Sequence, residues 1–375
     1  MKLIHLADLH LGKRVNEFPM IEDQEYILLK ILGVIDEERP DGILIAGDVY
    51  DKSVPSEDAM RLWDDFLVRL AKRSIPVYAI SGNHDSAVRF ADHGKLVDVT
   101  GIHLAPGYEG SLSSFTVEDA HGPVHIYLLP FIKPAMVRPF FEGEEIRDYT
   151  DACRLVIGRA AVDIAERNVL VAHQFVAGAE RCESEENIGG LDNVSVDVFD
   201  AFDYVALGHL HGPQKVGRET VRYAGSPLKY SFSEKDHHKS VTVVELGEKG
   251  DVTVRTVPLV PKHDLREIRG SYMELTDRSF YEGTDTEDYI HAVLTDEEDV
   301  PDAMARLRSV YPNIMKLTYD NLRTRTNAEV TGAVDVEHKT PLELFSEFYE
   351  LQNNQEMSED QREVVNDMIV SIWEA

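Results

Sequence analysis

The chain has 375 residues, of which 43% are apolar and 28% charged, and its 68 acidic and 38 basic side chains give a net charge of −30. This composition excludes a collagen-like or wholly disordered chain, and the length suits two to three domains. No apolar run approaches the roughly 18 residues of a membrane span, and the N-terminus becomes polar too soon for a signal peptide. Cys153 and Cys182 make no disulfide framework. We therefore expect a cytoplasmic protein.

The charge is unevenly distributed along the chain. Residues 281–375 hold 22 acidic and 7 basic side chains, which is half of the total net charge in a quarter of the length. Non-specific binding to nucleic acid depends on Lys and Arg that neutralise phosphates. Composition alone therefore argues against a DNA-binding protein.

Residues 1–265 alternate short apolar runs with amphipathic stretches. One such stretch, residues 56–73, carries apolar side chains at helical spacing, among them Trp63, Phe66 and Leu70. Alternation of strands and helices, followed by neighbouring strands, favours an α/β sandwich of two sheets. The apolar runs predict strands over residues 2–7, 42–46, 77–80, 125–129, 169–172, 204–207, 221–224, 241–245 and 252–258.

The remainder of the chain predicts three further segments. Residues 266–325 suggest a small α/β unit, with apolar runs at 290–294 and 314–319 on either side of a helix that begins near Pro301. Residues 326–339 are polar and without a clear period, as in a linker. Residues 340–375 predict two short helices, because Thr340 to Glu343 and Ser358 to Gln361 form capping boxes.

Five of the apolar runs lead into Asp, Asn or His side chains. The segments are Asp8-Leu9-His10, Gly47-Asp48, Gly82-Asn83-His84-Asp85, His173, and Gly208-His209-Leu210-His211. The carboxyl edge of a parallel sheet is where such folds build their sites. Each segment alone is weak evidence, and a lone His such as His173 is more often structural. Their joint occurrence at five strand ends indicates one site.

The residue types in these segments suit a centre of two metal ions. Asp, Asn and several His side chains favour Mn²⁺, Fe²⁺ or Zn²⁺ over Mg²⁺, which prefers an oxygen shell. Two such ions polarise a phosphoryl group and lower the pKa of a bound water. Their positive charge would also attract a phosphodiester to an otherwise acidic chain.

This series of motifs resembles the signature of the calcineurin-like metallophosphoesterase family, with every element present. The resemblance implies an αββα sandwich of two sheets. It assigns one metal to Asp8, His10, Asp48 and His211, and the other to Asp48, Asn83, His173 and His209, with Asp48 bridging. It places His84 outside the metal ligands, facing the scissile phosphate.

Two residues beside His84 have open roles. Asp85 either orients the ring of His84 as a catalytic-site residue or caps the following helix. Arg89 either contacts a backbone phosphate of DNA or forms a salt bridge on a helix face.

Longer segments resemble the SbcD family of nuclease subunits, which act in bacterial SbcCD complexes. They are MKLIHLADLHLGK at the N-terminus, GNHDSAVRF at 82–90 and RYAGSPLKYSFSEKDHHKSV at 222–241. The resemblance implies Mn²⁺-dependent 3′-to-5′ exonuclease action on duplex DNA and endonuclease action on single strands and hairpins. It also implies a homodimer within a heterotetramer that includes a coiled-coil ATPase of the SbcC type. The homodimer would form through helices matching residues 56–73 and 86–99, with Phe66 and Leu70 as candidate contacts, unless they belong to a wide core face.

The C-terminal helices are candidates for binding that ATPase. An apolar stripe beyond a polar linker is typical of a docking element, although the helices could instead pack on their own domain. The stripe comprises Leu342, Phe345, Phe348 and Tyr349 on the first helix, and Val364, Val365, Met368, Ile369, Ile372 and Trp373 on the second.

Two rival functions remain open from the sequence. A small-molecule or protein phosphoesterase would explain the acidity more simply, but it leaves residues 266–375 without a role. A non-catalytic scaffold is disfavoured, because all seven metal positions and His84 are intact.

Overall fold

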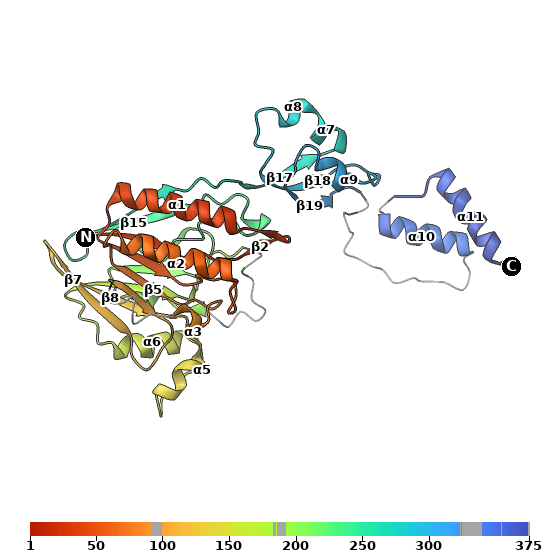
Figure 1. The fold of residues 1–375 in the computed structure, drawn as a ribbon. Coiled ribbons are helices and arrows are strands. Elements are labelled where there is room, and N and C mark those ends of the chain that lie inside the picture. The colour runs from red at the N-terminus through yellow and green to blue at the C-terminus, as the bar shows by residue number, and fades with distance from the viewer. Residues whose placement is uncertain are drawn as a thin grey trace. The chain divides into compact units, whose positions relative to one another are not determined.

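The computed structural model describes residues 1–91, 100–182, 185, 193–322, 324, 340–353 and 355–373 (Figure 1). The chain divides into two compact units, Met1–Asp264 and Leu265–Ala375. Among the described residues, no helix has the length and apolar character needed to cross a membrane. The predicted linker at 326–339 and the second half of the predicted helix at 86–99 lie outside the described residues.

The first sheet of the N-terminal unit has a parallel centre and an antiparallel edge. β1, β4, β5 and β6 run parallel, while β15 pairs antiparallel with β1 and β16 with β15. In spatial order, its strands are β16 (Val252–Pro258), β15 (Ser240–Leu246), β1 (Lys2–Leu6), β4 (Gly42–Ala46), β5 (Val77–Ile80) and β6 (Ile102–Ala105).

The second sheet repeats this arrangement. β14, β12, β9 and β8 run parallel, and the antiparallel strands β13 and β7 form its edges. Its strands, in spatial order, are β13 (Gln214–Val216), β14 (Arg218–Tyr223), β12 (Tyr204–Gly208), β9 (Arg167–His173), β8 (Gly122–Leu129) and β7 (Ser113–Asp119). Two small pairs are β2 (Arg14–Val15) with β3 (Phe18–Pro19), and β10 (Phe175–Val176) with β11 (Asn193–Val194).

The two sheets pack face to face, with helices on the outside. One buried cluster joins Leu44 and Ile80 of the first sheet to Ile126 and Val171 of the second. On the outer face of the second sheet, α6 packs its buried side chains against Leu170. Figure 1 shows α1 and α2 over the first sheet. The predicted αββα sandwich is confirmed. Its helices are α1 (Ile21–Glu38), α2 (Glu57–Ala71), α3 (Ala87–Phe90), α5 (Pro134–Val137) and α6 (Tyr149–Arg159), with 3₁₀ turns η1 (Arg138–Phe140), η3 (Val196–Phe199) and η4 (Phe232–Glu234).

The amphipathic stretch at 56–73 forms α2, whose first turn is capped by the Ser56 side chain accepting from the Ala59 amide. Phe66 and Leu70 are fully buried in the chain itself. The prediction that Phe66 and Leu70 contact a second subunit is therefore wrong, because both side chains belong to the core beneath α2.

The C-terminal unit contains a small parallel sheet and two capped helices. β17 (Leu265–Gly270), β18 (Tyr289–Leu294) and β19 (Ile314–Tyr319) pair in that order. The short helices α7 (Tyr272–Thr276), α8 (Arg278–Tyr281) and α9 (Ala303–Leu307) accompany them. α10 (Pro341–Asn353) and α11 (Glu359–Trp373) begin at the predicted capping boxes, where Thr340 Oγ1 accepts from the Glu343 amide and Ser358 Oγ accepts from the Gln361 amide.

Candidate metal centre

The polar segments predicted from the sequence follow the carboxyl ends of five parallel strands. Asp8 and His10 follow β1, and Asp48 follows β4. Asn83 and His84 follow β5, His173 ends β9, and His209 and His211 follow β12. The two sheets present these ends to the same place, because β1 and β12 loops that are 201 residues apart in sequence contact each other. The structure therefore brings all the predicted ligands together.

The backbone at this place is held in unusual conformations. Asp8, His10, Asp48 and His209 have φ values of 52°, 44°, 48° and 104°, which side chains with a Cβ atom rarely adopt. Hydrogen bonds between the loops fix them: the Asp8 amide donates to Gly47 O at 3.1 Å, and the His10 amide donates to Asp48 O at 2.9 Å. Strain of this kind clusters at functional sites.

Two glycines permit the close approach of the loops. A Cβ atom on Gly82 would lie 2.1 Å from Asp48 Oδ1, and one on Gly208 would lie 1.8 Å from Ala46 O. Any larger residue would push the β5 loop away from Asp48 or the β12 loop away from Ala46. The Gly-Asn-His and Gly-His-x-His motifs thus require glycine for steric reasons.

Asp8, His10, Asp48 and His211 form the first cluster. All four are buried, and the Nε2 atoms of His10 and His211 face each other at 3.1 Å. His10 Nε2 lies 3.7 Å from Asp48 Oδ2. Asp8 is held by the His209 amide, which donates to Asp8 Oδ1 at 2.9 Å.

Asp48, Asn83, His173 and His209 form the second cluster. Asp48 Oδ2 lies 3.4 Å from His173 Nε2. Asn83 Oδ1 lies 3.0 Å from His173 Nε2 and 2.9 Å from His209 Nδ1. Since Asp48 Oδ2 approaches a histidine of each cluster, Asp48 stands between the two.

The ionisable side chains of the two clusters shift one another's pKa values. Burial raises the pKa of Asp8 to about 7, and the neighbouring Asp48 carboxylate raises it further against the effect of His173. Burial would lower the pKa of His173, but the carboxylates of Asp48 and Asp8 raise it to about 9. Burial would raise the pKa of Asp48, yet His173 and His10 hold it well below its usual value. The site therefore holds a proton that a cation would displace.

The donor set fits a pair of divalent cations. Among the described residues, three groups of side chains have ligand atoms close enough to share an ion: one comprises Cys182, Glu185 and His211, and the two centred on this site are His10, Asp48 and His84, and Asp8, Asp48 and His173. Asp48 belongs to both. His10 Nδ1 is buried without a hydrogen-bond partner. Two imidazole nitrogens 3.1 Å apart could each lie about 2.1 Å from one ion. Mixed imidazole, carboxylate and amide donors suit Mn²⁺, Fe²⁺ or Zn²⁺.

His84 stands beside the first cluster and is positioned by the β4 loop. Its Nδ1 lies 2.8 Å from the Asp51 carbonyl oxygen, and its amide donates to Asp48 Oδ1 at 2.9 Å. Its ring packs edge-to-face on His10, with centroids 4.9 Å apart. The Nδ1 contact leaves Nε2 as the nitrogen available to a substrate.

Asp85 makes contacts that neither predicted role describes. Its carboxylate accepts from the backbone amides of Gly82, Val49 and Tyr50 at 2.9, 3.1 and 2.8 Å. The His84 ring is oriented by Asp51 instead, and α3 is preceded by Ser86. Asp85 thus ties the β4 loop to the β5 loop.

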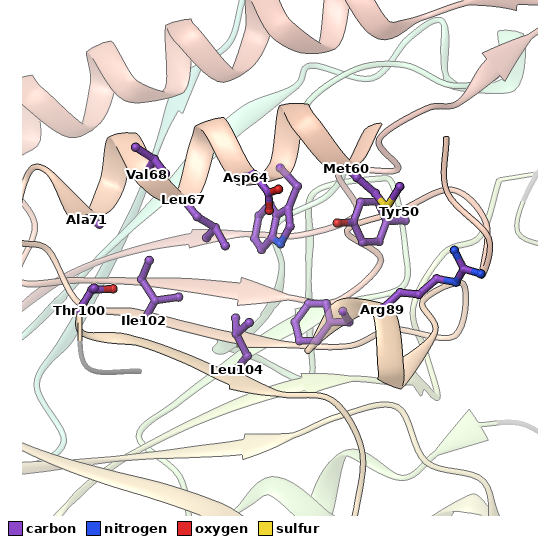
Figure 2. Close-up of a pocket in the computed structure, with 12 residues that line it drawn as sticks. Tyr50, Met60, Asp64, Leu67, Val68, Ala71, Arg89, Thr100, Ile102 and Leu104 are labelled. Carbon is purple, nitrogen blue, oxygen red and sulfur yellow. The ribbon is translucent and has the colours of Figure 1, made fainter. Parts of the chain in front are cut away.

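Arg89 lies on α3 and lines a surface pocket. It is exposed and lines a pocket of about 420 Å³ with Trp63, Met60 and Val68 of α2 (Figure 2). Most of the other lining residues are apolar, including Ile102 and Leu104 of the edge strand β6.

Three buried polar residues behind the first cluster were not identified from the sequence as part of the site. Glu234 and Lys239 lie behind His211, and Tyr230 packs on the rings of both His10 and His211. All three fall in the segment at 222–241 that carries the resemblance to the SbcD family. Their position in this segment was the sequence signal that could have identified them.

Comparison with known proteins identifies the family. The calcineurin-like phosphoesterase family matches residues 1–213. A family described as type 5 capsule protein repressor C-terminal domain, SbcD_C, matches residues 261–353. The curated SbcD subunit of the SbcCD nuclease from Staphylococcus epidermidis is 30% identical over 377 residues, covering 98% of each chain.

Two solved structures are similar to the N-terminal part of the chain. A dimetal phosphatase from Danio rerio is 12% identical with a TM-score of 0.44, covering 69% of this chain and 96% of that one. A 5′-nucleotidase precursor from Thermus thermophilus is 11% identical with a TM-score of 0.39, covering 70% of this chain and 54% of that one. From the matches along its sequence, the chain belongs to the calcineurin-like phosphoesterase family and, within it, to the SbcD family of nuclease subunits.

Proposed function

We propose that the chain is the nuclease subunit of an SbcCD-type complex and hydrolyses DNA phosphodiesters at the Asp48 site with two Mn²⁺ ions. The observation that carries this proposal is the convergence of seven ligand side chains on two clusters that share Asp48. Two bound cations would polarise a phosphoryl oxygen and lower the pKa of a bound water.

The protein's own residues have separable tasks in this reaction. Asp8, His10, Asp48 and His211 would hold one ion, and Asp48, Asn83, His173 and His209 the other. His84 would place Nε2 against the scissile phosphate, where it stabilises charge or protonates the leaving 3′ oxygen, because the Asp51 carbonyl engages Nδ1. Asp85 would keep His84 in place indirectly, through the two loops that it joins.

The net charge of −30 requires that DNA affinity come from elsewhere than the general surface. We assign it to the cations at the site and to the ATPase partner, with Arg89 as a candidate phosphate contact. Such a substrate places the protein in the bacterial cytoplasm. The resemblance further suggests 3′-to-5′ exonuclease action on duplex ends and endonuclease action on hairpins and single strands.

The C-terminal helices are proposed to dock on the SbcC-type ATPase. Phe345, Phe348, Val364 and Met368 are exposed by 42%, 57%, 59% and 59%. Exposed aromatic side chains of this kind supply the anchors of protein interfaces. Phe345, Phe348 and Val364 of the stripe are therefore exposed in the described part of the chain, as anchors of a docking element would be, while Leu342, Tyr349, Val365 and Ile369 are half-buried.

The other segments receive roles under the same proposal. Residues 266–325 would act as a capping domain that places DNA. The homodimer of nuclease subunits would cover the apolar pocket beside α2, where Met60 and Val68 are accessible (Figure 2).

The experiment that tests the function compares two substrates under one set of conditions. Purified protein with Mn²⁺ should degrade a DNA hairpin, and EDTA should abolish the reaction. A generic aryl phosphodiester serves as the comparison. Rapid hydrolysis of the aryl ester with an intact hairpin would favour a small-molecule phosphoesterase. If neither the hairpin nor the aryl ester is hydrolysed, a non-catalytic scaffold would be favoured.

A further inference from the structure

A buried ion pair lies directly behind one of the proposed metal ligands. Glu234, at the end of η4, is fully buried, and its Oε1 lies 2.9 Å from His211 Nδ1. The Lys239 ammonium, also buried, donates to Glu234 Oε2 at 2.6 Å. Glu234 therefore connects a buried cation to the ring of His211.

The hydrogen bonds of Lys239 are complete. Besides Glu234, its ammonium donates to the His211 carbonyl oxygen at 2.9 Å and to Ser226 Oγ at 2.8 Å. These three bonds use all three N–H donors of a lysine. Lys239 thus holds both the backbone of His211 and the carboxylate that meets its ring.

The carboxylate determines which nitrogen of His211 faces the metal site. With Nδ1–H donating to Glu234, the lone pair of His211 is on Nε2, which lies 3.1 Å from His10 Nε2. A carboxylate in this position fixes the tautomer of a metal-binding histidine and raises its basicity.

The second cluster has no equivalent arrangement at His173. The Nδ1 of His173 lies 2.7 Å from the Ala46 carbonyl oxygen, which is a neutral acceptor, and the Asp8 carboxylate is beyond hydrogen-bond distance, at 4.0 Å. A carboxylate partner strengthens the ligand more than a carbonyl does, because it carries a full charge. His211 and His173 therefore differ in the charge of the group that their Nδ1 atoms meet.

We propose that Glu234 and Lys239 are positioning residues that make the cation site of His211 the tighter of the two. This inference rests on the proposed function, since it takes His211 as a ligand. Glu234 would set the affinity through the ring of His211, and Lys239 would keep Glu234 ionised and in place. A purely structural pair would only anchor residues 226–239 to the core.

The test measures metal binding by calorimetric titration of the metal-free protein with Mn²⁺. The wild type should show a tighter and a weaker class of site. Glu234→Gln should weaken the tighter class about 10- to 100-fold and leave the weaker class within about twofold. Wild type that binds fewer than two ions would instead refute the two-metal function itself.

A double variant separates positioning from stability. Glu234→Gln leaves the Lys239 ammonium facing an amide, so the single variant should also melt at a lower temperature. Glu234→Gln with Lys239→Met removes both charges and should recover much of the melting temperature, because a neutral buried pair has no uncompensated ion. The metal affinity should stay low. Recovery of affinity together with melting temperature would overturn the proposal.

The matched control is a second ion pair of the N-terminal unit, formed by the buried Arg167 and Asp119. Arg167 donates to Asp119 across the edge of the second sheet. Asp119→Asn should lower the melting temperature without changing either class of Mn²⁺ site. An equal loss of Mn²⁺ affinity in Asp119→Asn would mean that any loss of stability weakens the metals, and the assignment to Glu234 would be wrong.

Discussion

The Nε2 atoms of His10 and His211 face each other at 3.1 Å, although the two residues come from different sheets. Each ring is held from behind by the protein. Tyr230 packs edge-to-face on both, with centroids 5.7 and 6.0 Å away, and its hydroxyl is bound to the Leu9 carbonyl. Two imidazoles aimed at one point by a buried scaffold are what a cation site requires.

Asp48 should be essential for both ions. It approaches His173 of one cluster and His10 of the other, so Asp48→Ala should remove metal and nuclease activity together. Elemental analysis of the dialysed variant would measure the loss. Two ions per chain in a folded Asp48→Ala protein would refute the bridging role.

His84 should matter for turnover and not for metal content. His84→Ser should keep both ions, while turnover falls about 10²- to 10⁴-fold, the usual effect of losing a proton-transfer group. Elemental analysis and a hairpin-cleavage time course check the two parts. A variant that loses an ion would make His84 a ligand.

Metal binding should release protons in a manner that depends on pH. The metal-free site raises the pKa of Asp8 to about 7, by burial, and that of His173 to about 9, through Asp48 and Asp8 against burial. Both groups must lose their protons to bind a cation, so affinity should fall as pH drops from 9 to 6. Calorimetry in buffers of different ionisation enthalpy should detect more protons released at pH 6 than at pH 8. Equal release at both values would contradict these shifts.

The C-terminal helices should be dispensable for the core. Deleting residues 340–375 should leave a folded, metal-loaded protein with Mn²⁺-dependent nuclease activity, because the seven proposed ligands lie in the unit Met1–Asp264. The deletion should abolish binding to the ATPase and any ATP dependence. A pull-down and a melting curve measure both. Intact partner binding with a large loss of thermal stability would place the helices in the core.

Two positions on α2 should distinguish self-association from folding. Val68 is 49% exposed and lines the apolar pocket, whereas Phe66 is 2% exposed. Val68→Asp should give folded monomers that keep their metals. Phe66→Asp should unfold the protein, since it places a charge in the core. Ile164→Asp, at a site 70% exposed elsewhere, is the control for added charge. Light scattering that finds monomeric wild type at micromolar concentration would refute the dimer.

The sequence predicted the central strands of both large sheets and the edge strand β16, but missed the other edge strands β6, β13 and β7. The bounds of β4, β5 and β16 are those predicted, and the apolar runs of β4 and β5 end sharply at Gly47 and Ser81. The edge strands β7 and β17 were not predicted. Their polar and charged side chains, as in Ser113–Asp119 and Leu265–Gly270, resemble loop sequence and are ordered only by pairing with a neighbour.

The same distinction applies to the site. The convergence of its proposed ligands was predictable, because chemically specific residues follow strand ends that a parallel fold brings together. Glu234 and Lys239 were not, since a Ser-Glu-Lys-Asp-His-His-Lys segment reads as a solvated turn. Burial of that charged pair depends on tertiary contacts with His211 and Ser226, which no local pattern encodes.

Anomalous diffraction from crystals grown with Mn²⁺ tests the account most directly. Two peaks should appear, both within about 2.0–2.2 Å of Asp48 carboxylate oxygens. One peak should also contact His10 and His211, and the other Asn83, His173 and His209. A single peak, or peaks that do not share Asp48, would contradict the two-metal centre on which the proposed nuclease function depends.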